Sequence, residues 1–314
     1  MWERFIEPMK PVSHPQVFAN DRFLYQVKWD GVRMLSYIEK GQVTLINKNL
    51  KDKTLQFPEL SALSNLLKEK RAVLDGELVV LKDGRPHFPS ILRRNFGSIP
   101  TQINLLSKRL PVIYMIFDLI ILGDRDLRRE PLEIRTSLLN DCVNWQEPFH
   151  VVESFADGAK LFAAVKESDL EGVVAKRKSS PYTEGKKHND WLKIKYRKRR
   201  SFVIGGFTSK QNRINALVIG LFDHNADPAG LYYVGRAGTG LKEQQWDLLS
   251  AELPKLKTER SPFINLKASQ LKEAVFIEPV LTAEIEYAEL TDNLYIRAPV
   301  IIGFSPVSPE ECHF

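Results

Sequence analysis

The sequence has little of what disulfide-rich, zinc-binding or membrane proteins require. Two cysteines, Cys142 and Cys312, are too few and too isolated for a disulfide framework or a zinc site. No run of about 18 apolar residues is present, which argues against a membrane-spanning helix. The opening residues, MWERFIEPMK, carry charges every few positions and lack the apolar core of a signal peptide. We therefore expect a cytoplasmic protein with no membrane partner.

Positive charge is concentrated in the first two thirds of the chain. Residues 1–200 contain 35 Lys+Arg against 25 Asp+Glu, a balance of +10. Residues 201–314 contain 10 against 14, a balance of −4. A basic N-terminal part favours a polyanionic partner such as nucleic acid. The alternative, a surface charge that only keeps the protein in solution, stays open on composition alone.

Strand-like and helical patterns both occur before residue 198. The β-branched runs RAVLDGELVVL (71–81) and PVIYMIFDLIIL (111–122) predict buried strands. Apolar residues at helical spacing predict helices over 57–70 and 153–168. This mixture indicates an α+β fold.

The composition changes near Lys198–Ser201, which predicts a domain boundary. Beyond it come five or so strand-like pieces with Gly-rich turns and one helical segment, LKEQQWDLLSAEL (241–253). Short strands with a single helix are typical of a small Greek-key barrel such as an OB-fold. We therefore predict two domains, residues 1–198 and residues 202–314.

Lys28 lies in the segment QVKWDGVRML, Gln26 to Leu35, which has the pattern of a β-hairpin turning at Asp30-Gly31. A lysine that loses hydration on a buried strand favours its neutral amine. That amine is a nucleophile for an electrophilic phosphorus or carbonyl. The alternative is a lysine at a strand edge whose ammonium reaches solvent, and the segment alone leaves both open.

Two acids and two lysines stand in other strand-like segments. Glu77 in LDGELVVL and Glu171 in LEGVVAK are surrounded by apolar residues, so each should be paired or hold a cation. Together with Lys28 they suggest a magnesium–phosphate site, although a salt bridge explains Glu77 equally well. Lys193 and Lys195 in WLKIKY point to one face of a strand. Either an anion lies between them or that face is solvated.

These segments, taken together, resemble a known family. KWDGVR, LDGELVVL, YMIFDLI, LEGVVAK and WLKIK occur in the order and spacing of the collinear motifs of the covalent nucleotidyltransferases. The chain is most similar to bacterial ATP-dependent DNA ligases of the ligase D type, and the similarity extends from about Phe5 to Gly303. It implies a catalytic domain of antiparallel sheets flanked by helices, followed by an OB-fold barrel.

The resemblance implies that Lys28 attacks the α-phosphate of ATP to form a lysyl-AMP phosphoramidate. Lys193 and Lys195 match the lysines that contact the α-phosphate and stabilise its transition state. Glu77 matches an acid near the ribose and metal, and Glu171 matches a metal-binding acid. The expected metal is Mg²⁺, with Mn²⁺ as a substitute.

The resemblance also implies how the nucleotide is held. Arg33 matches an arginine that contacts the ribose and helps to engage the nick in DNA. Phe117 matches the aromatic residue that stacks on adenine. The family commonly has a glutamate two residues before the nucleophile, and here the residue is Gln26, whose amide oxygen can still accept from the adenine amino group.

Further basic residues are expected to contact DNA. Lys48 and Arg94 lie where the family has arginines, and a lysine at position 48 cannot make the bidentate phosphate contact of an arginine. The basic run KYRKRR adds Lys198, Arg199 and Arg200.

The final segment retains Arg297, expected to orient pyrophosphate, but lacks the Asp-Lys pair with which many relatives end. This departure predicts slow self-adenylation unless another residue supplies the charge.

The resulting prediction is a monomeric ATP-dependent DNA ligase that seals 5′-phosphate/3′-hydroxyl breaks in duplex DNA. As a bacterial repair enzyme it is expected at the nucleoid, beside end-binding or polymerase repair proteins. Two alternatives are an RNA ligase of the same superfamily and a module that binds DNA ends without catalysis.

Overall fold

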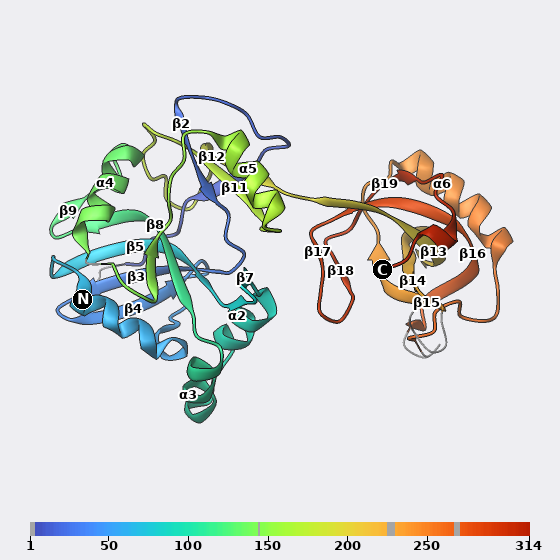
Figure 1. Cartoon of the computed structure of the whole chain (residues 1–314), viewed down its shortest axis with the longest axis horizontal. Coiled ribbons are helices and arrows are strands. Elements are labelled where there is room, and N and C mark those ends of the chain that lie inside the picture. The colour runs from blue at the N-terminus through green and yellow to red at the C-terminus, as the bar shows by residue number, and fades with distance from the viewer. Residues whose placement is uncertain (1–3, 144, 225–229, 267–270) are drawn as a thin grey trace. The chain divides into compact units, whose positions relative to one another are not determined.

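Figure 1 shows the computed structural model, which describes residues 4–143, 145–224, 230–266 and 271–314. The chain divides into two units, Met1–Tyr196 and Arg197–Phe314. The division falls two residues before the predicted end of the first domain at residue 198. Among the described residues, no helix has both the length and the apolar character needed to cross a membrane.

The first unit contains two main sheets (Figure 1). The smaller has the strand order β1-β12-β11-β2, and the larger has the order β10-β8-β5-β3-β4 with β9 paired to β8. A small separate hairpin is formed by β6 and β7. The strands are β1 (Lys10–Ser13), β2 (Phe23–Val27), β3 (Val32–Glu39), β4 (Gln42–Asn47), β5 (Arg71–Val79), β6 (Leu81–Lys82), β7 (Arg85–Pro86), β8 (Ile113–Leu122), β9 (Arg125–Asp126), β10 (Phe149–Val151), β11 (Gly172–Arg177) and β12 (Lys187–Lys195).

Helices flank these sheets. Helix α5 packs on β11 and β2 of the smaller sheet, and α4 packs on β8 of the larger sheet. The helices are α1 (Leu63–Leu66), α2 (Phe88–Asn95), α3 (Pro100–Arg109), α4 (Leu132–Cys142) and α5 (Gly158–Glu167), with short 3₁₀ turns η1 (Thr54–Gln56) and η2 (Pro58–Ala62). The predicted arrangement of antiparallel sheets flanked by helices is confirmed, except that β1 with β12 and β10 with β8 are parallel pairs at sheet edges.

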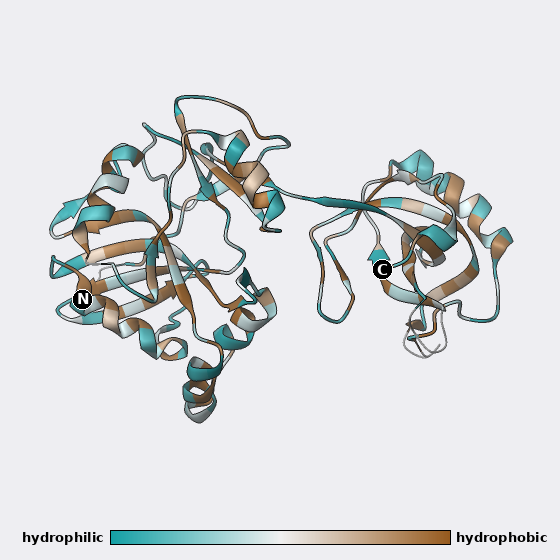
Figure 2. Cartoon of the chain, viewed as in Figure 1, coloured by the Kyte–Doolittle hydropathy of each residue, from teal (hydrophilic) through white to brown (hydrophobic). Residues whose placement is uncertain are grey.

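The larger sheet is buried on both faces because its strands carry apolar residues at successive positions. In β3, Met34 and Ile38 belong to the core on one face, while Leu35 and Tyr37 belong to the core on the other. Figure 2 shows the strands of this sheet largely in brown. Trp191 of β12 shares the second core, so this core lies between the two sheets.

The predicted hairpin around Asp30-Gly31 is wrong. Strand β2 pairs with β11 in the smaller sheet, whereas β3 pairs with β4 and β5 in the larger sheet. The residues between β2 and β3 therefore cross from one sheet to the other. A turn dipeptide indicates that the chain changes direction, but pairing is decided by strands distant in sequence.

The helix predicted over 57–70 is replaced by η2 and the single turn of α1. The chain becomes extended at Leu67 and forms a β-bridge with Val143. Here a backbone partner from a distant segment outweighs the helical spacing of the apolar residues. The other predicted helices form, α5 within 153–168 and α6 within 241–253.

The second unit is a five-stranded barrel-like sheet with one helix. Its strand order is β15-β14-β13-β16-β19, and α6 lies in the chain between β15 and β16. The Ile301 amide donates to the Thr239 carbonyl at 2.8 Å, which links β19 to the segment after β15 and closes the barrel as in an OB-fold. The elements are β13 (Lys198–Lys210), β14 (Arg213–Asp223), β15 (Gly230–Ala237), α6 (Glu243–Glu252), η3 (Leu253–Leu256), β16 (Ala274–Tyr287), β17 (Glu289–Leu290), β18 (Ile296–Arg297), β19 (Val300–Phe304) and η5 (Pro309–Glu311).

Candidate active site

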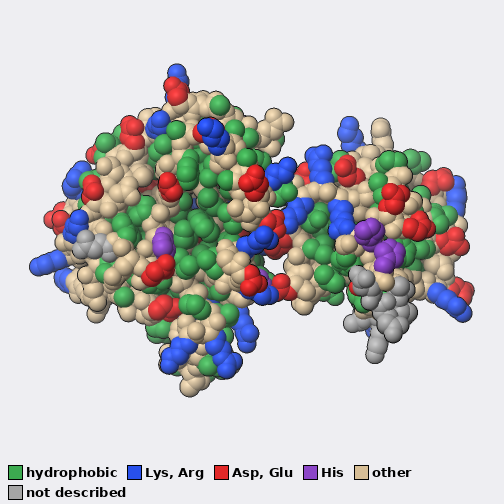
Figure 3. All heavy atoms as spheres, viewed as in Figure 1, with side chains coloured by type: hydrophobic (Ala, Val, Ile, Leu, Met, Phe, Trp, Pro, Cys, Tyr) green, Lys and Arg blue, Asp and Glu red, His purple; other side chains and the backbone are tan. Residues whose placement is uncertain are grey.

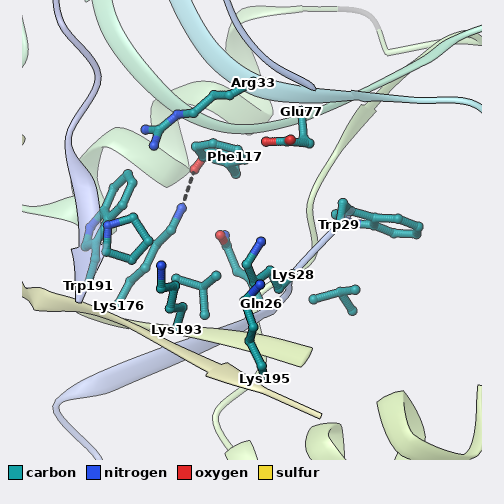
Figure 4. Close-up of a pocket in the computed structure, with 13 residues that line it drawn as sticks. Gln26, Lys28, Trp29, Arg33, Glu77, Phe117, Lys176, Trp191, Lys193 and Lys195 are labelled. Atoms are coloured by element: carbon teal, nitrogen blue, oxygen red, sulfur yellow. Dashed lines mark hydrogen bonds between the residues drawn. The ribbon is translucent and has the colours of Figure 1, made fainter. Parts of the chain in front are cut away.

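A cavity of about 220 Å³ lies between the two sheets of the first unit. Figure 4 shows side chains entering it from both sides, with Arg33, Glu77 and Phe117 opposite the lysines of the smaller sheet. All seven residues predicted to hold the nucleotide line this cavity. The full lining is Pro11, Gln26, Val27, Lys28, Trp29, Arg33, Glu77, Phe117, Val174, Lys176, Trp191, Lys193 and Lys195.

Lys28 begins the segment that crosses between the sheets. Its amide donates to the Gly172 carbonyl at 2.9 Å, which fixes the start of the crossing against β11. At Gly31 an added Cβ would lie 2.2 Å from the Leu78 carbonyl oxygen of β5. Only glycine allows this close approach, so the crossing segment is held at both ends.

Glu171 lies between two of the lysines. Its carboxylate accepts hydrogen bonds from Lys28 Nζ and Lys195 Nζ, each at 2.6 Å. Burial alone would raise the pKa of Glu171, but these two ammonium groups hold the pKa below its ordinary value. The nucleophile predicted from sequence therefore shares one carboxylate with a second lysine.

Lys193 and Glu77 are titratable groups with no ion-pair partner among the described residues. Burial, together with Lys195 and Lys28, lowers the pKa of Lys193. Burial raises the pKa of Glu77 to about 8, although Lys28 and Arg33 oppose that shift. An anion beside Lys193 and a cation or hydroxyl beside Glu77 would satisfy both groups, as bound nucleotide and metal would.

Arg33 is fixed by the protein itself. Its guanidinium forms two hydrogen bonds to Asp75, at 2.9 Å and 2.5 Å, and donates to the Met9 carbonyl at 2.6 Å. Tyr182 donates its hydroxyl to Asp75 at 2.6 Å. This bidentate pairing preorganises Arg33 at the wall of the cavity.

Lys176 and Trp191 line the cavity but were missed by sequence reasoning. The Lys176 ammonium lies 4.2 Å from the ring centroids of both Phe117 and Trp191, and it donates to the Phe117 carbonyl at 3.3 Å. Burial lowers the pKa of Lys176 to about 7. Lys176 ends the LEGVVAK motif, and its even spacing from Val174 could have indicated a shared strand face.

Gln26 presents its amide to the cavity (Figure 4). Its amide nitrogen donates to the Ser154 hydroxyl at 2.9 Å, which leaves the amide oxygen to accept from a ligand. Ser154 lies far away in the sequence and no local pattern marked it.

The residues present fit a magnesium ion only in company with a nucleotide. No group of three or more His, Cys, Asp or Glu side chains with metal-binding geometry occurs among the described residues. Glu171 is near enough to Glu77 to contribute to the raised pKa of Glu77. Magnesium is commonly held by one or two carboxylates together with substrate phosphates, and this pair matches that donor set.

The prediction that Arg94 contacts DNA is corrected by the structure. The Arg94 side chain has no exposed surface. It is bonded to the Glu59 carboxylate at 2.8 Å and to the carbonyls of Leu110 and Gln56. A guanidinium enclosed in this way ties α2 to neighbouring segments. Lys48, by contrast, is exposed and has no ion pair among the residues that the structure describes.

The other predicted DNA and pyrophosphate contacts lie in the second unit. Lys198, Arg199 and Arg200 begin strand β13, and Arg199 is paired with Glu286 at 3.1 Å. Arg297 lies in β18 and is paired with Glu289 at 2.9 Å. The basic run is thus part of a sheet and is partly neutralised by acids of the same unit.

A cavity between two sheets that is lined by Lys28, Lys193, Lys195 and Glu77, with a barrel-like unit after it in the chain, agrees with the arrangement that the resemblance implied. The family model described as "ATP dependent DNA ligase domain" matches residues 8–195. The model described as "ATP dependent DNA ligase C terminal region" matches residues 210–307. The chain therefore belongs to the ATP-dependent DNA ligase family.

Individual relatives agree with this assignment. The multifunctional non-homologous end joining DNA repair protein LigD of Mycobacterium tuberculosis is 32% identical over 292 residues, covering 91% of this chain and 36% of that protein. DNA ligase C1 of Mycolicibacterium smegmatis is 33% identical over 264 residues, covering 80% of this chain and 73% of that protein. A structure of mycobacterial DNA ligase D complexed with ATP and MES is 31% identical, with a TM-score of 0.57. The match covers 98% of this chain and 97% of the chain in that structure. The chain spans about a third of the length of its LigD relatives.

Proposed function

We propose that the cavity binds ATP and that Lys28 becomes adenylated. The observation that carries this proposal is the convergence of Lys28, Lys193 and Lys195 at one cavity, with Lys28 and Lys195 both bonded to Glu171 behind them. The Lys28 ammonium first loses a proton to solvent, and the resulting neutral amine attacks the α-phosphorus of ATP. A nitrogen–phosphorus bond forms, the bond to the β-phosphate oxygen breaks, and pyrophosphate leaves while the amine loses its proton.

Two transfers to DNA complete the reaction. The oxygen of a DNA 5′-phosphate attacks the lysyl-AMP phosphorus, AMP passes to the DNA, and Lys28 regains its proton. The adjacent 3′-hydroxyl then attacks the 5′-phosphate and releases AMP. Each step depends mainly on positioning and on neutralising phosphate charge.

The cavity residues have separate roles in this proposal. Lys193 and Lys195 neutralise the α-phosphate, and Arg33 is preorganised beside the ribose. Phe117 provides an apolar surface for adenine and Gln26 an acceptor for its amino group. Glu77 and Glu171 would hold a magnesium ion, which when bound adds positive charge next to the phosphates.

Labelled ATP tests the proposal directly. With Mg²⁺ present, the protein should carry the label through denaturing electrophoresis, and addition of nicked duplex should remove it. Lys28→Ala should abolish labelling, whereas Lys160→Ala, at a lysine whose side chain is 88% exposed, should not change it. Retained labelling in Lys28→Ala would exclude Lys28 as the nucleophile. Transfer of the label to a 5′-phosphorylated RNA in preference to nicked DNA would favour an RNA ligase.

We also propose that the chain seals breaks in duplex DNA during repair. Support comes from relatives named as non-homologous end joining proteins, which are about three times longer than this chain. The ligation step would then act beside end-binding or polymerase proteins at the nucleoid, with this chain as a monomer. Comparing sealing rates for nicks and for cohesive double-strand ends, with and without such proteins, tests the assignment.

A further inference from the structure

The segment from Gly84 to Phe117 has no acidic residue, although acids make up more than a tenth of the chain. Its cations fall into two groups. Arg94 is enclosed with Glu59, and Arg85 lies 3.7 Å from Asp169. The remaining cations are exposed and form no ion pair with any residue in the described ranges, namely Arg93, Lys108 and Arg109.

Exposed apolar side chains lie in the same segment. Phe96, at the C-terminus of α2, is 72% exposed, Ile99 is 50% exposed and Leu105 of α3 is 49% exposed. A groove between the end of α2 and α3 is lined by Arg93, Phe96, Gly97, Gln102, Leu105 and Leu106. Single exposed apolar residues are ordinary, but a cluster beside a groove marks an interaction surface.

The free cations flank this groove. Lys108 and Arg109 follow Leu105 by three and four residues, so they share its face of α3. Arg93 stands on the opposite wall, on α2. Figure 3 shows blue and green side chains, without red, over the projecting end of the first unit at the bottom of the view. The surface therefore combines an apolar floor with uncompensated positive charge.

We propose that this α2–α3 groove binds the backbone of duplex DNA outside the nucleotide cavity. DNA is the occupant that the charge favours, because a polyanion would neutralise three free cations and would meet no carboxylate in the segment. Phe96 would contact the sugars or base edges of the minor groove, as apolar residues of minor-groove proteins do. The interaction is independent of base sequence. The inference rests on the proposed function, because it takes DNA as the substrate.

Charge neutralisation tests the groove. The triple variant Arg93→Gln, Lys108→Gln, Arg109→Gln should bind nicked duplex more weakly in fluorescence anisotropy. The log–log salt slope should become shallower by about 0.9 for each phosphate that the protein no longer neutralises. The matched control is Lys160→Gln, Lys210→Gln, Lys255→Gln, which removes the same charge from scattered exposed lysines and should keep the slope of the unmodified protein.

A second pair of variants tests the apolar part. Phe96→Ser should weaken binding about fivefold or more, because serine has no ring to pack on a base or sugar. Ile134→Ser, at a residue of α4 that is 43% exposed, should have no effect. Label transfer from ATP to the protein in the absence of DNA should be unaltered in every variant.

The outcomes distinguish a failure of the groove as a DNA site from a failure of the proposed ligase function. Normal labelling with unchanged DNA affinity and salt slope in the triple variant would overturn the groove as a DNA site and leave the ligase assignment intact. The same result, with weaker binding of a repair protein, would make the groove a protein-docking surface and would equally overturn the inference. Absent labelling in the unmodified protein would refute the ligase assignment, and the slope would still decide whether the groove binds DNA.

Discussion

The two acidic residues at the cavity, Glu77 and Glu171, differ in how far the protein compensates their burial. Glu171 is satisfied by Lys28 and Lys195, whereas Glu77 has no partner close enough to offset its burial. Groups left in this state are common at functional sites, because substrate completes their interactions. The folded protein therefore gives up some stability to keep Glu77 in place.

The titration of Glu77 makes this cost in stability measurable. Its pKa of about 8 lies far above the ordinary value of 4.5, so the folded protein keeps a proton that the unfolded chain releases between those pH values. The free energy of unfolding must then fall as pH rises from about 4.5 to 8. Glu77→Gln removes this dependence and should be more stable than the unmodified protein by about 1–3 kcal/mol at high pH.

Denaturant titrations at about pH 5 and about pH 9, without ATP or metal, check this prediction. The advantage of the variant should be small at the lower pH and appear at the higher. A constant difference at both values would mean that Glu77 is ionised throughout. The same variant should lose magnesium-dependent adenylation.

Arg93 and Arg94 are adjacent in the sequence, but we expect Arg94 to contribute to the stability of the fold and Arg93 to contribute to DNA binding. Arg94→Ala leaves the partly buried Glu59 carboxylate and two carbonyls without their donor, so it should lower the free energy of unfolding by about 2–4 kcal/mol. Arg93→Ala, at an exposed position, should change stability by less than about 0.5 kcal/mol but weaken DNA binding. Thermal unfolding and DNA affinity measured on both variants provide the comparison. Equal decreases in stability would contradict the separation.

At the scale of elements, local sequence predicts strands better than it predicts their pairing. The runs over 71–81 and 111–122 form β5 and β8 because β-branched apolar residues suit a sheet that is buried on both faces. The hairpin prediction failed because β2 and β3 find different partners far along the chain. The residues around Lys28 do not show which strands β2 and β3 will pair with, so the sequence could not reveal that Lys28 starts a crossing between the two sheets.

The site was predictable to the extent that motifs mark it. Seven predicted residues line the cavity because each lies in a motif whose order is distinctive. Trp191, Lys176 and Ser154 were missed because their roles depend on packing across the sheets. Arg94 was misplaced because a sequence pattern does not distinguish an enclosed arginine from an exposed one.

The crossing segment itself can be tested at Gly31. Gly31→Ala places a methyl group against the Leu78 carbonyl oxygen, so the backbone must shift. This shift should lower the free energy of unfolding by about 1–3 kcal/mol. Because the shift moves Lys28, the rate of label transfer from ATP should fall by about tenfold or more. Gly303→Ala is the matched control, since its added Cβ would meet no atom within 4 Å. Labelling that is unchanged in a folded Gly31→Ala protein would show that the crossing tolerates movement.

At the scale of the whole molecule, charge and chemistry are divided between the two units. The cavity residues all belong to the first unit, which is basic, with 31 Lys+Arg against 25 Asp+Glu, whereas the second unit has 14 of each and no net charge. Within the second unit Arg199 and Arg297 are each paired with a glutamate. These two arginines, predicted to contact DNA and pyrophosphate, are therefore already partly neutralised within the second unit.

Arg297 provides the test, because adenylation must release pyrophosphate and the later steps need not. If Arg297 orients pyrophosphate, Arg297→Ala should slow label transfer from ATP by roughly a hundredfold, equivalent to ~3 kcal/mol of transition-state stabilisation. Sealing of a nick that already carries AMP should be nearly unaffected. Sealing of such a nick, without ATP, should also be faster than overall sealing from ATP in the unmodified protein, because residues 295–314 contain no Asp-Lys pair to assist Arg297.

Glu289 supplies the matched control for this prediction. Glu289→Gln removes the carboxylate that now neutralises Arg297 at 2.9 Å but keeps the arginine. Adenylation in this variant should be at least as fast as in the unmodified protein, because the Glu289 carboxylate no longer competes with pyrophosphate for the guanidinium. If Arg297→Ala and Glu289→Gln slow adenylation equally, the β17–β18 ion pair is structural. The same conclusion follows if Arg297→Ala slows sealing from ATP and sealing of the pre-adenylated nick equally. Pyrophosphate would then have to be oriented by residues of the first unit alone. Lys193 would be the first of these to mutate, because it has no ion-pair partner within the described ranges.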